Sequence, residues 1–306
     1  MFMQCASIDL GTNSARLLIG SVDSRSRIRP LFFKREITRL GGGFSKEKGL
    51  SLEARKRTLA VLQEFAGEIQ RHGVKKIRAV ATSAVRDAVN GGHFVGEVFQ
   101  QTGITLEVIG GRDEGLLTLR GIFSGIRGEG DVLVFDIGGG STEYTLAHDE
   151  TSLYTKSLSL GVVRLTEGKK SIPAMDDKIH RELEILLADL SLAGYPEVSP
   201  KTRLIGTAGT PTTLAGIELE VRDYDSRSVH GHILSLDSIR KIYARILPLT
   251  PEQRLLVPGI ERGREDLILA GTLITMRTME RFGFEFLTVS ESGLLEGLLL
   301  TLQSDS

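Results

Sequence analysis

The sequence lacks the features that usually accompany export or membrane insertion. Its 306 residues include a single cysteine, Cys5, so no internal disulfide can form, and a reducing compartment fits this usage. The amino-terminal region has no basic segment followed by a long apolar run, and no stretch of about 18 apolar residues occurs. We therefore predict no signal peptide, no membrane span and a cytoplasmic location.

An excess of charge of either sign is also lacking. The chain has 38 lysine and arginine residues together and 39 aspartate and glutamate residues together. The formal net charge is therefore −1. A polyanion must then be bound by a local patch, and no nucleic-acid partner is predicted. A hydrophobic fraction of 41% and a charged fraction of 25% are ordinary for a folded chain with a full core. The length suggests roughly two domains.

The most informative stretch that is present is Asp-Ile-Gly-Gly-Gly-Ser-Thr-Glu at 136–143. The apolar runs 132–135 and 144–147 flank it, so the pattern predicts the tip of a β-hairpin. Three glycines allow close backbone approach, and consecutive amides form a concavity that favours an anion. Ser141 and Thr142 add hydroxyl donors, and the carboxylates at both ends can hold a hard cation that bridges to phosphate.

Two better-known phosphate motifs do not describe this stretch. It lacks the Gly-Lys-Ser/Thr ending of a Walker loop, and the residues after it do not continue as a helix, as a dinucleotide fingerprint requires. A plain hairpin loop without a ligand is the alternative interpretation.

The amino terminus repeats this layout. A short apolar run at 6–8 leads into Asp-Leu-Gly-Thr-Asn-Ser at 9–14, and 16–22 continues as a second apolar segment. A repeat at domain-sized spacing predicts two similar α/β domains that each present a phosphate loop to a shared cleft. A chance repeat of a six-residue pattern is the alternative.

Two further segments combine a strand end with hydroxyls at a helix start. The strand at 77–81 runs into Thr82 and Ser83, and Arg86 follows one turn later. The strand at 204–206 runs into the Gly/Thr-rich segment 207–213. Both suit an oxyanion at a helix amino terminus, although Ser and Thr at such positions commonly serve only as caps.

Two acids follow the strand predicted at 106–109. Asp113 and Glu114 precede a helix expected over 115–123. One interpretation is a general base aimed at the substrate, and the other is stabilisation of the helix dipole by acids in its first turn.

The remaining patterns predict the framework around these segments. Arg262 and Arg264 are expected to open a helix. Either could bind an outer group of an anionic ligand, although arginines at a helix start more often face solvent. His230 and His232 could hold a metal, but no third ligand is evident nearby, so a turn with ordinary polar histidines is favoured. The other expected elements are helices over 51–72, 176–192 and 293–302 and strands over 157–163 and 286–289.

Eight ordered segments resemble one family, the exopolyphosphatase / guanosine pentaphosphate phosphatase group. They are DLGTNSARL (9–17), ATSAVRDA (81–88), VIGGRDEG (108–115), FDIGGGSTEY (135–144), IGTAGTPTTLA (205–215), VHGHILSL (229–236), GREDLILAG (263–271) and VSESGLLEGLL (289–299).

The resemblance implies an α/β fold of two ribonuclease-H-like lobes from the actin-like, sugar kinase and Hsp70 superfold, with an interdomain cleft. It implies a first lobe over 1–116, a second over 117–290, and a closing helix at 291–306 that packs back on the first. The chain is similar to the short form of the family, without a helical carboxy-terminal extension.

The resemblance also implies roles for individual residues. Glu114 falls on the proposed catalytic base, and Asp136 and Glu143 fall on acids associated with magnesium and the attacking water. We add Asp9 to this acid set. Together with the segments above, the expected phosphate-binding residues are Gly11, Thr12, Asn13, Ser14, Arg16, Thr82, Arg86, Gly138, Gly139, Gly140, Ser141, Thr142, Gly206, Gly209 and Thr210.

The sequence departs from the family pattern around the base. Many members have Ser and Ala where this chain has Gly110 and Gly115. The base itself is retained, but we expect these two changes to leave the corner looser.

The expected activity is removal of orthophosphate from the end of inorganic polyphosphate, of the 5′ γ-phosphate of guanosine pentaphosphate, or of both. The expected cofactor is Mg2+, with another divalent ion or an added monovalent ion as alternatives, and a homodimer is compatible with the resemblance. An ATP-dependent small-molecule kinase of the same superfold and a non-catalytic binder of polyphosphate or alarmone are the alternative functions. The sequence leaves open which of the two substrates dominates.

Overall fold

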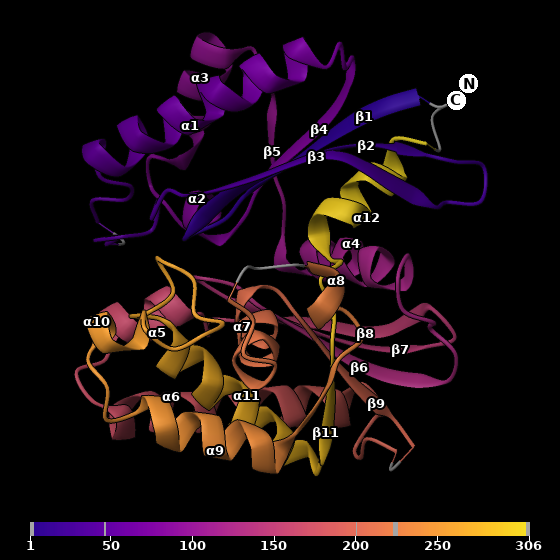
Figure 1. Cartoon of the computed structure of the whole chain (residues 1–306), viewed down its shortest axis with the longest axis vertical. Coiled ribbons are helices and arrows are strands. Elements are labelled where there is room, and N and C mark those ends of the chain that lie inside the picture. Colours follow the sequence, from indigo (N-terminus) through magenta and orange to yellow (C-terminus); the bar gives the residue numbers. More distant parts are fainter. Residues whose placement is uncertain (1–2, 46, 200, 223–225, 304–306) are drawn as a thin grey trace. The chain divides into compact units, whose positions relative to one another are not determined.

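The computed structural model describes residues 3–45, 47–199, 201–222 and 226–303 (Figure 1). Its backbone divides into two compact units. Unit 1 comprises Met1–Ser124 and Ser292–Ser306, and unit 2 comprises Gly125–Glu291. The boundary expected after residue 116 falls inside helix α4 (Gly111–Phe123), which stays whole in unit 1 because it packs against α12 (Leu294–Thr301).

Unit 1 is built on a five-stranded sheet with the order β3-β2-β1-β4-β5. The first three strands are antiparallel neighbours, and β4 and β5 run parallel to β1. The strands are β1 (Met3–Leu10), β2 (Ser14–Val22), β3 (Ile28–Ile37), β4 (Lys76–Ala81) and β5 (Leu106–Val108).

Helices cover both faces of this sheet. The helix expected over 51–72 is confirmed as α1 (Leu52–Arg71), which Ser51 caps by accepting a hydrogen bond from the Ala54 amide at 3.2 Å. The apolar side of α1, which includes the fully buried Phe65, and residues of α3 (Gly91–Thr102) belong to one hydrophobic core. A short helix, α2 (Ser83–Arg86), follows β4. In a second apolar cluster, Leu295 and Leu299 of α12 pack against Leu18 of β2.

Helices α4 and α12 approach each other closely through glycine. A Cβ on Gly121 would lie 1.8 Å from the Gly293 carbonyl oxygen, and one on Gly297 would lie 1.9 Å from the Leu117 carbonyl oxygen. Real Cβ atoms do not come so close, so both positions exclude any larger residue while the helices keep this spacing. The reciprocal contact fixes α4, which carries Glu114, against α12.

Unit 2 repeats the sheet of unit 1. Its six strands have the order β10-β11-β9-β6-β7-β8, in which β8-β7-β6 are antiparallel and β9 and β11 run parallel to β6. The edge strand β10 is an antiparallel addition. The strands are β6 (Asp131–Ile137), β7 (Thr142–His148), β8 (Thr151–Leu158), β9 (Arg203–Thr207), β10 (Ile233–Ser235) and β11 (Phe286–Val289). Each unit is therefore ribonuclease-H-like, and the pair has the actin-like architecture expected from the sequence.

Two sequence-based assignments in unit 2 are wrong. The strand expected over 157–163 ends at Leu158, because Val162 already begins helix α5. Arg262 and Arg264 precede α11 instead of opening it, since that helix starts at Ile268. The helices are α5 (Val162–Gly168), α6 (Ile172–Leu192), α7 (Gly209–Glu218), α8 (Ser226–Val229), α9 (Leu236–Ile246), α10 (Pro251–Arg254) and α11 (Ile268–Phe282). No helix in the described part of the chain is long and apolar enough to cross a membrane.

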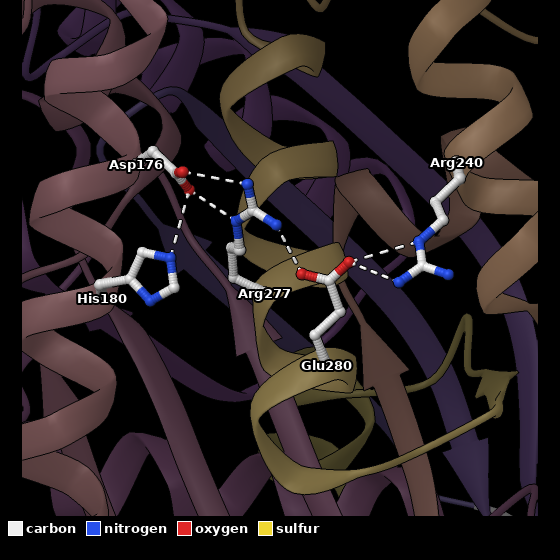
Figure 2. Close-up of polar contacts among 5 residues, drawn as sticks. All are labelled: Asp176, His180, Arg240, Arg277 and Glu280. Atoms are coloured by element: carbon white, nitrogen blue, oxygen red, sulfur yellow. Dashed lines mark hydrogen bonds and ion pairs between the residues drawn. The ribbon is translucent and has the colours of Figure 1, made fainter.

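An ion-pair network joins three helices of unit 2 (Figure 2). Arg277 of α11 makes a bidentate pair with Asp176 of α6, with donor–acceptor distances of 2.6 and 2.9 Å. Glu280, one turn further along α11, accepts hydrogen bonds from Arg277 at 2.5 Å and from Arg240 of α9 at 2.7 Å. Burial raises the pKa of Glu280, but the hydrogen bonds from Arg240 and Arg277 outweigh it, so the net pKa is lowered.

Candidate active site

The two predicted phosphate loops are the tips of matching hairpins. Loop 1 (Gly11–Ser14) joins β1 to β2, and loop 2 (Gly138–Thr142) joins β6 to β7. In loop 1 the Gly11 amide donates a 3.0 Å hydrogen bond to the Ser14 carbonyl, and in loop 2 the Gly138 amide donates one of the same length to Ser141. The sequence repeat therefore reflects one local structure that occurs once in each unit.

The carbonyl oxygens of loop 2 are held by the start of α5. Val162 N donates to Gly138 O at 3.0 Å, Val163 N donates to Gly139 O at 2.9 Å, and Arg164 Nε donates to Gly140 O at 2.8 Å. Within the described residues, nothing accepts a hydrogen bond from the backbone amides of Gly139 and Gly140. A loop with occupied carbonyls and available amides can bind an anion.

Gly161 gives α5 its close access to loop 2. A Cβ on Gly161 would lie 2.4 Å from both the carbonyl carbon and the carbonyl oxygen of Gly139. The neighbouring Leu160 carbonyl accepts a hydrogen bond from the Thr142 hydroxyl. Gly161 could not be identified from sequence patterns, because its role depends on a contact between two separate segments.

Two carboxylates stand at the base of loop 2. Asp136 of β6 and Glu143 of β7 are directly opposite in register and are only 7% and 2% exposed. Glu143 Oε1 accepts a 2.7 Å hydrogen bond from the hydroxyl of Ser157, its neighbour on β8. The described residues contain no group of three or more metal-ligating side chains. Two carboxylates nevertheless suit Mg2+, which usually takes one or two from the protein and completes its shell with water and phosphate oxygens.

In unit 1 the corresponding positions carry an ion pair. Asp9 of β1 is opposite Arg16 of β2, and Arg16 donates from Nε to Asp9 Oδ2 at 2.8 Å and from Nη2 at 2.5 Å. Thr12 of loop 1 shares a 2.9 Å hydrogen bond with the Ser83 hydroxyl, which connects the loop to α2. Asp9, predicted with the metal acids, thus engages a guanidinium within its own unit.

Glu114 lies within the first turn of α4, which begins four residues earlier than expected, at Gly111. The Glu114 side chain is buried, and Arg86 Nη1 lies 3.6 Å from its Oε2 atom. Arg86 Nη1 also donates a 2.9 Å hydrogen bond to the Ile109 carbonyl, which ties the arginine to the end of β5. The structure brings Arg86 and Glu114 together, and α4 continues through Gly115 without interruption.

The third Gly/Thr segment forms loop 3 (Gly206–Thr210), between β9 and α7. Thr207 is the register neighbour of Asp136, so loop 3 begins beside loop 2 at the same edge of the sheet. Ala208 has a positive φ of 67°, which turns the chain into the helix. The guanidinium of Arg264 occupies the space beside Gly209, with Nη1 only 1.3 Å from where a Cβ would be. Arg264 Nε lies 3.2 Å from Glu261 Oε2.

The two histidines of the 229–232 turn have polar partners inside unit 2. His232 Nε2 lies 2.5 Å from Glu218 Oε2, and His230 Nδ1 accepts a 3.2 Å hydrogen bond from the Glu291 amide. Gly231 between them has a φ of +78°, as a turn requires. These contacts agree with ordinary polar roles.

The predicted site residues therefore form two groups. Unit 1 holds loop 1 with Asp9 and Arg16, the Thr82 helix start, and the pair Arg86–Glu114. Unit 2 holds loops 2 and 3 with Asp136 and Glu143. Together with the duplicated sheet, these loops place the protein in the class of two-unit, actin-like proteins with phosphate-loop hairpins.

A sequence model of the Ppx/GppA phosphatase family matches residues 18–305, and the chain belongs to that family. Exopolyphosphatase 2 of Mycobacterium tuberculosis is 32% identical over 313 residues, covering 97% of this chain and 98% of that protein.

Two further similarities extend this assignment. A bifunctional 3-dehydroquinate synthase/phosphatase of Fusobacterium nucleatum is 33% identical and matches 96% of this chain, which spans only 46% of that longer protein. The crystal structure of the Aquifex aeolicus family member is 33% identical, with a TM-score of 0.82 and coverage of 100% of this chain and 99% of that one.

Proposed function

We propose that this protein hydrolyses terminal phosphoanhydride bonds. It releases orthophosphate from the end of inorganic polyphosphate, from the 5′ position of guanosine pentaphosphate, or from both. Family membership and the exopolyphosphatase relative support the reaction class. The observation that carries the proposal is loop 2, where the amides of Gly139 and Gly140 have no acceptor among the described residues and two buried acids lie at the base.

Loop 2 binds the phosphoryl group in this proposal. The amides of Gly139 and Gly140 and the Ser141 hydroxyl donate to phosphate oxygens, whereas the Thr142 hydroxyl donates to the Leu160 carbonyl and shapes the loop. Hydrogen bonds from the start of α5 hold the loop carbonyls away from the phosphate. Donors held in place before the reaction stabilise developing charge without reorganisation, which is the main contribution of a protein to phosphoryl transfer.

Asp136 and Glu143 are the residues that would hold Mg2+. When bound there, the ion neutralises charge on phosphate oxygens and orients the reacting groups. Both acids are buried and adjacent, and such like charges are more stable with a cation between them. Asp9 stays a weaker proposal as a ligand, since Arg16 already donates twice to its Oδ2 atom.

Glu114 acts as the general base. Its carboxylate accepts a proton from the attacking water, whose oxygen forms the new bond to phosphorus. The anhydride P–O bond breaks at the same time, and its bridging oxygen leaves with the shortened chain or nucleotide. Arg86, 3.6 Å from the Glu114 carboxylate and anchored on Ile109, contributes positive charge for a phosphate oxygen close to that base. To Arg264, whose guanidinium lies beside Gly209 of loop 3, we assign selection among groups beyond the terminal phosphate. A cytoplasmic location and a homodimer stay predictions.

The test is phosphate release by the wild-type protein and the Glu114→Gln variant. Long-chain polyphosphate and guanosine pentaphosphate are supplied separately, with Mg2+ or with a chelator. Loss of a general base lowers turnover by about 10²–10⁴-fold, and the chelator is expected to abolish release.

The matched control is Asp113→Asn, which removes an exposed acid from the same turn of α4. It should keep wild-type turnover. Wild-type turnover in Glu114→Gln would show that the assigned base is wrong, and no phosphate release by wild type from either substrate would overturn the proposed function. The ratio of kcat/KM values for the two substrates identifies the preferred one.

A further inference from the structure

Glu143 has a hydroxyl partner on the neighbouring strand. Asp136, Glu143 and Ser157 are register neighbours across β6, β7 and β8, so their side chains leave one face of the unit 2 sheet. The Ser157 hydroxyl donates a 2.7 Å hydrogen bond to Glu143 Oε1, and Glu143 is 2% exposed. Ser157 lies outside the eight segments that carry the family resemblance, yet it contacts one of the two acids at the base of loop 2.

We propose that Ser157 is a positioning residue, which orients the Glu143 carboxylate for binding a divalent cation. This assignment rests on the proposed magnesium site at Asp136 and Glu143. It extends that site by a residue that touches the carboxylate and not the cation.

The carboxylate of a glutamate is not oriented by its own side chain. Its last torsion has a broad, roughly two-fold energy profile, so the carboxylate plane turns easily without a polar partner. Mg2+ requires nearly ideal octahedral geometry at about 2.0–2.1 Å. The donor 2.7 Å from Glu143 Oε1 favours one orientation of that plane before a cation binds. Removing such a partner of a metal ligand typically lowers metal affinity by about 10–100-fold.

The donor on β8 is also of a type that is compatible with a bound cation. A serine hydroxyl carries no formal charge, so Ser157 orients Glu143 without repelling a positive ion. In unit 1 the register partner of Asp9 is Arg16, whose guanidinium donates to the Asp9 carboxylate. A cation beside that carboxylate would meet a positive charge. A neutral donor at position 157 therefore agrees with a metal site in unit 2.

A second hydroxyl pair lies farther along the same strands. Thr145 of β7 and Thr155 of β8 are direct register partners on the face of Glu143 and Ser157, and their hydroxyls lie 3.3 Å apart. Cross-strand pairs of this kind stabilise a sheet. Because the Thr145–Thr155 pair contains no acid, it provides a reference for strand pairing without carboxylate orientation.

The experiment measures binding of Mn2+ alone by electron paramagnetic resonance, in which the signal of the free ion falls on binding. Mn2+ prefers the same octahedral oxygen ligands as Mg2+. Ser157→Val and Ser157→Thr are the matched pair, because their side chains have nearly the same shape and only threonine keeps a hydroxyl. We expect Ser157→Val to weaken Mn2+ binding about 10–100-fold and Ser157→Thr to bind like wild type.

Two controls test whether the effect acts through Glu143. Thr155→Val removes a hydroxyl from the same face of β8 and should bind Mn2+ like wild type. Glu143→Gln should lose the site, and adding Ser157→Val to it should cause no further loss. Ser157→Ala, which removes the hydroxyl without adding a methyl group, repeats the test if urea titration shows that Ser157→Val does not fold.

The Mg2+ dependence of phosphate release distinguishes positioning from a general structural defect. In Ser157→Val the half-saturating Mg2+ concentration should rise by the factor found for Mn2+, and kcat at saturating Mg2+ should return to the wild-type value. A structural defect would lower kcat at every Mg2+ concentration. Unchanged Mn2+ affinity in Ser157→Val, or a loss equal to that of Ser157→Thr or Thr155→Val, overturns the positioning role.

The outcomes separate this role from the proposed reaction. Mn2+ binding that depends on Ser157, with no phosphate release by wild type, would leave the positioning role standing and reject hydrolysis. Phosphate release by wild type, with the same Mn2+ affinity and Mg2+ requirement in Ser157→Val, would reject the role and leave hydrolysis standing. A wild-type protein that binds no Mn2+ through Glu143 would overturn the role as well.

Discussion

At the scale of single residues, Gly161 determines the shape of loop 2. Its missing Cβ allows the start of α5 to reach the carbonyls of Gly138, Gly139 and Gly140. We predict that Gly161→Ala moves loop 2 and lowers phosphate release at least tenfold. Forcing a methyl group into such a contact also destabilises a protein by about 1–3 kcal/mol. Phosphate-release kinetics and a urea titration check both effects.

Gly168→Ala is the control at the other end of α5. A Cβ there would meet nothing within 4 Å, so this variant should keep full activity. Equal activity of the two alanine variants would show that loop 2 tolerates displacement.

Sequence patterns predicted some of these residues and missed others, for a physical reason. One hairpin contains Asp136, Glu143 and the glycines of loop 2. A short continuous segment of the sequence was therefore enough to predict that they lie together. Gly161 and Arg264 act on loops far from them in sequence, and only the folded chain shows those contacts. The pairing of Asp9 with Arg16 depends on strand register, which the residue pattern alone does not determine.

At the scale of elements, the α4–α12 contact positions the proposed base. Gly297 of α12 touches the Leu117 carbonyl of α4 so closely that no Cβ fits. We predict that Gly297→Ala pushes the helices apart, destabilises the protein by about 1–3 kcal/mol and lowers phosphate release, because Glu114 moves with α4. Chemical denaturation and phosphate-release assays measure these changes.

Gly67→Ala in α1 provides the comparison. A Cβ there would meet no atom within 4 Å, and alanine is favoured over glycine inside a helix by about 0.5–1 kcal/mol. This variant should be as stable as wild type or more so. A destabilisation equal to that of Gly297→Ala would show that the helix contact is not the cause.

The network of Figure 2 gives unit 2 a pH-dependent contribution to stability. The pKa of Glu280 lies below its usual value near 4.5 in the folded state. Its stabilisation is therefore present above the unfolded pKa and is lost as the pH falls through the folded pKa. We predict that Glu280→Gln costs about 1–2 kcal/mol at neutral pH and nothing once the wild-type carboxyl is protonated. Thermal unfolding between pH 7 and about pH 3 measures this.

Glu184→Gln is the matched variant, since Glu184 of α6 also pairs with an arginine of α11, Arg281, at 2.7 Å. Glu184 is 58% exposed, whereas Glu280 is 25% exposed, so its effect should be much smaller. Equal, pH-independent losses in both variants would contradict the assigned role of Glu280.

Elements with strong internal patterns were predictable. The helix at 52–71 has a cap and an apolar stripe, and both are found. The region after β8 was not predictable, because the apolar residues 160–163 suit a strand as well as a helix start. The contacts of Gly161 and Val162 with loop 2 decide between them, and these contacts belong to the tertiary structure.

At the scale of the whole molecule, the hairpin repeat predicted the duplicated architecture. The order β3-β2-β1-β4-β5 recurs as β8-β7-β6-β9-β11. The repeat was visible because each unit begins with its loop-bearing hairpin. The difference between the two hairpins was not recognisable without the strand register, so Asp9 was grouped with the metal acids. The cross-strand partner of Asp9 in unit 1 is Arg16, whereas that of Asp136 in unit 2 is Glu143.

Unit 1 is also interrupted in the chain, because α12 follows all of unit 2. A ribosome adds about 5–20 residues per second, so α12 is synthesised roughly 9–35 s after Ser124. Until then the sheet side that Leu18 and Val80 line lacks its partner leucines on α12. A nascent chain thus finishes loop 2 before α4 gains the support of α12.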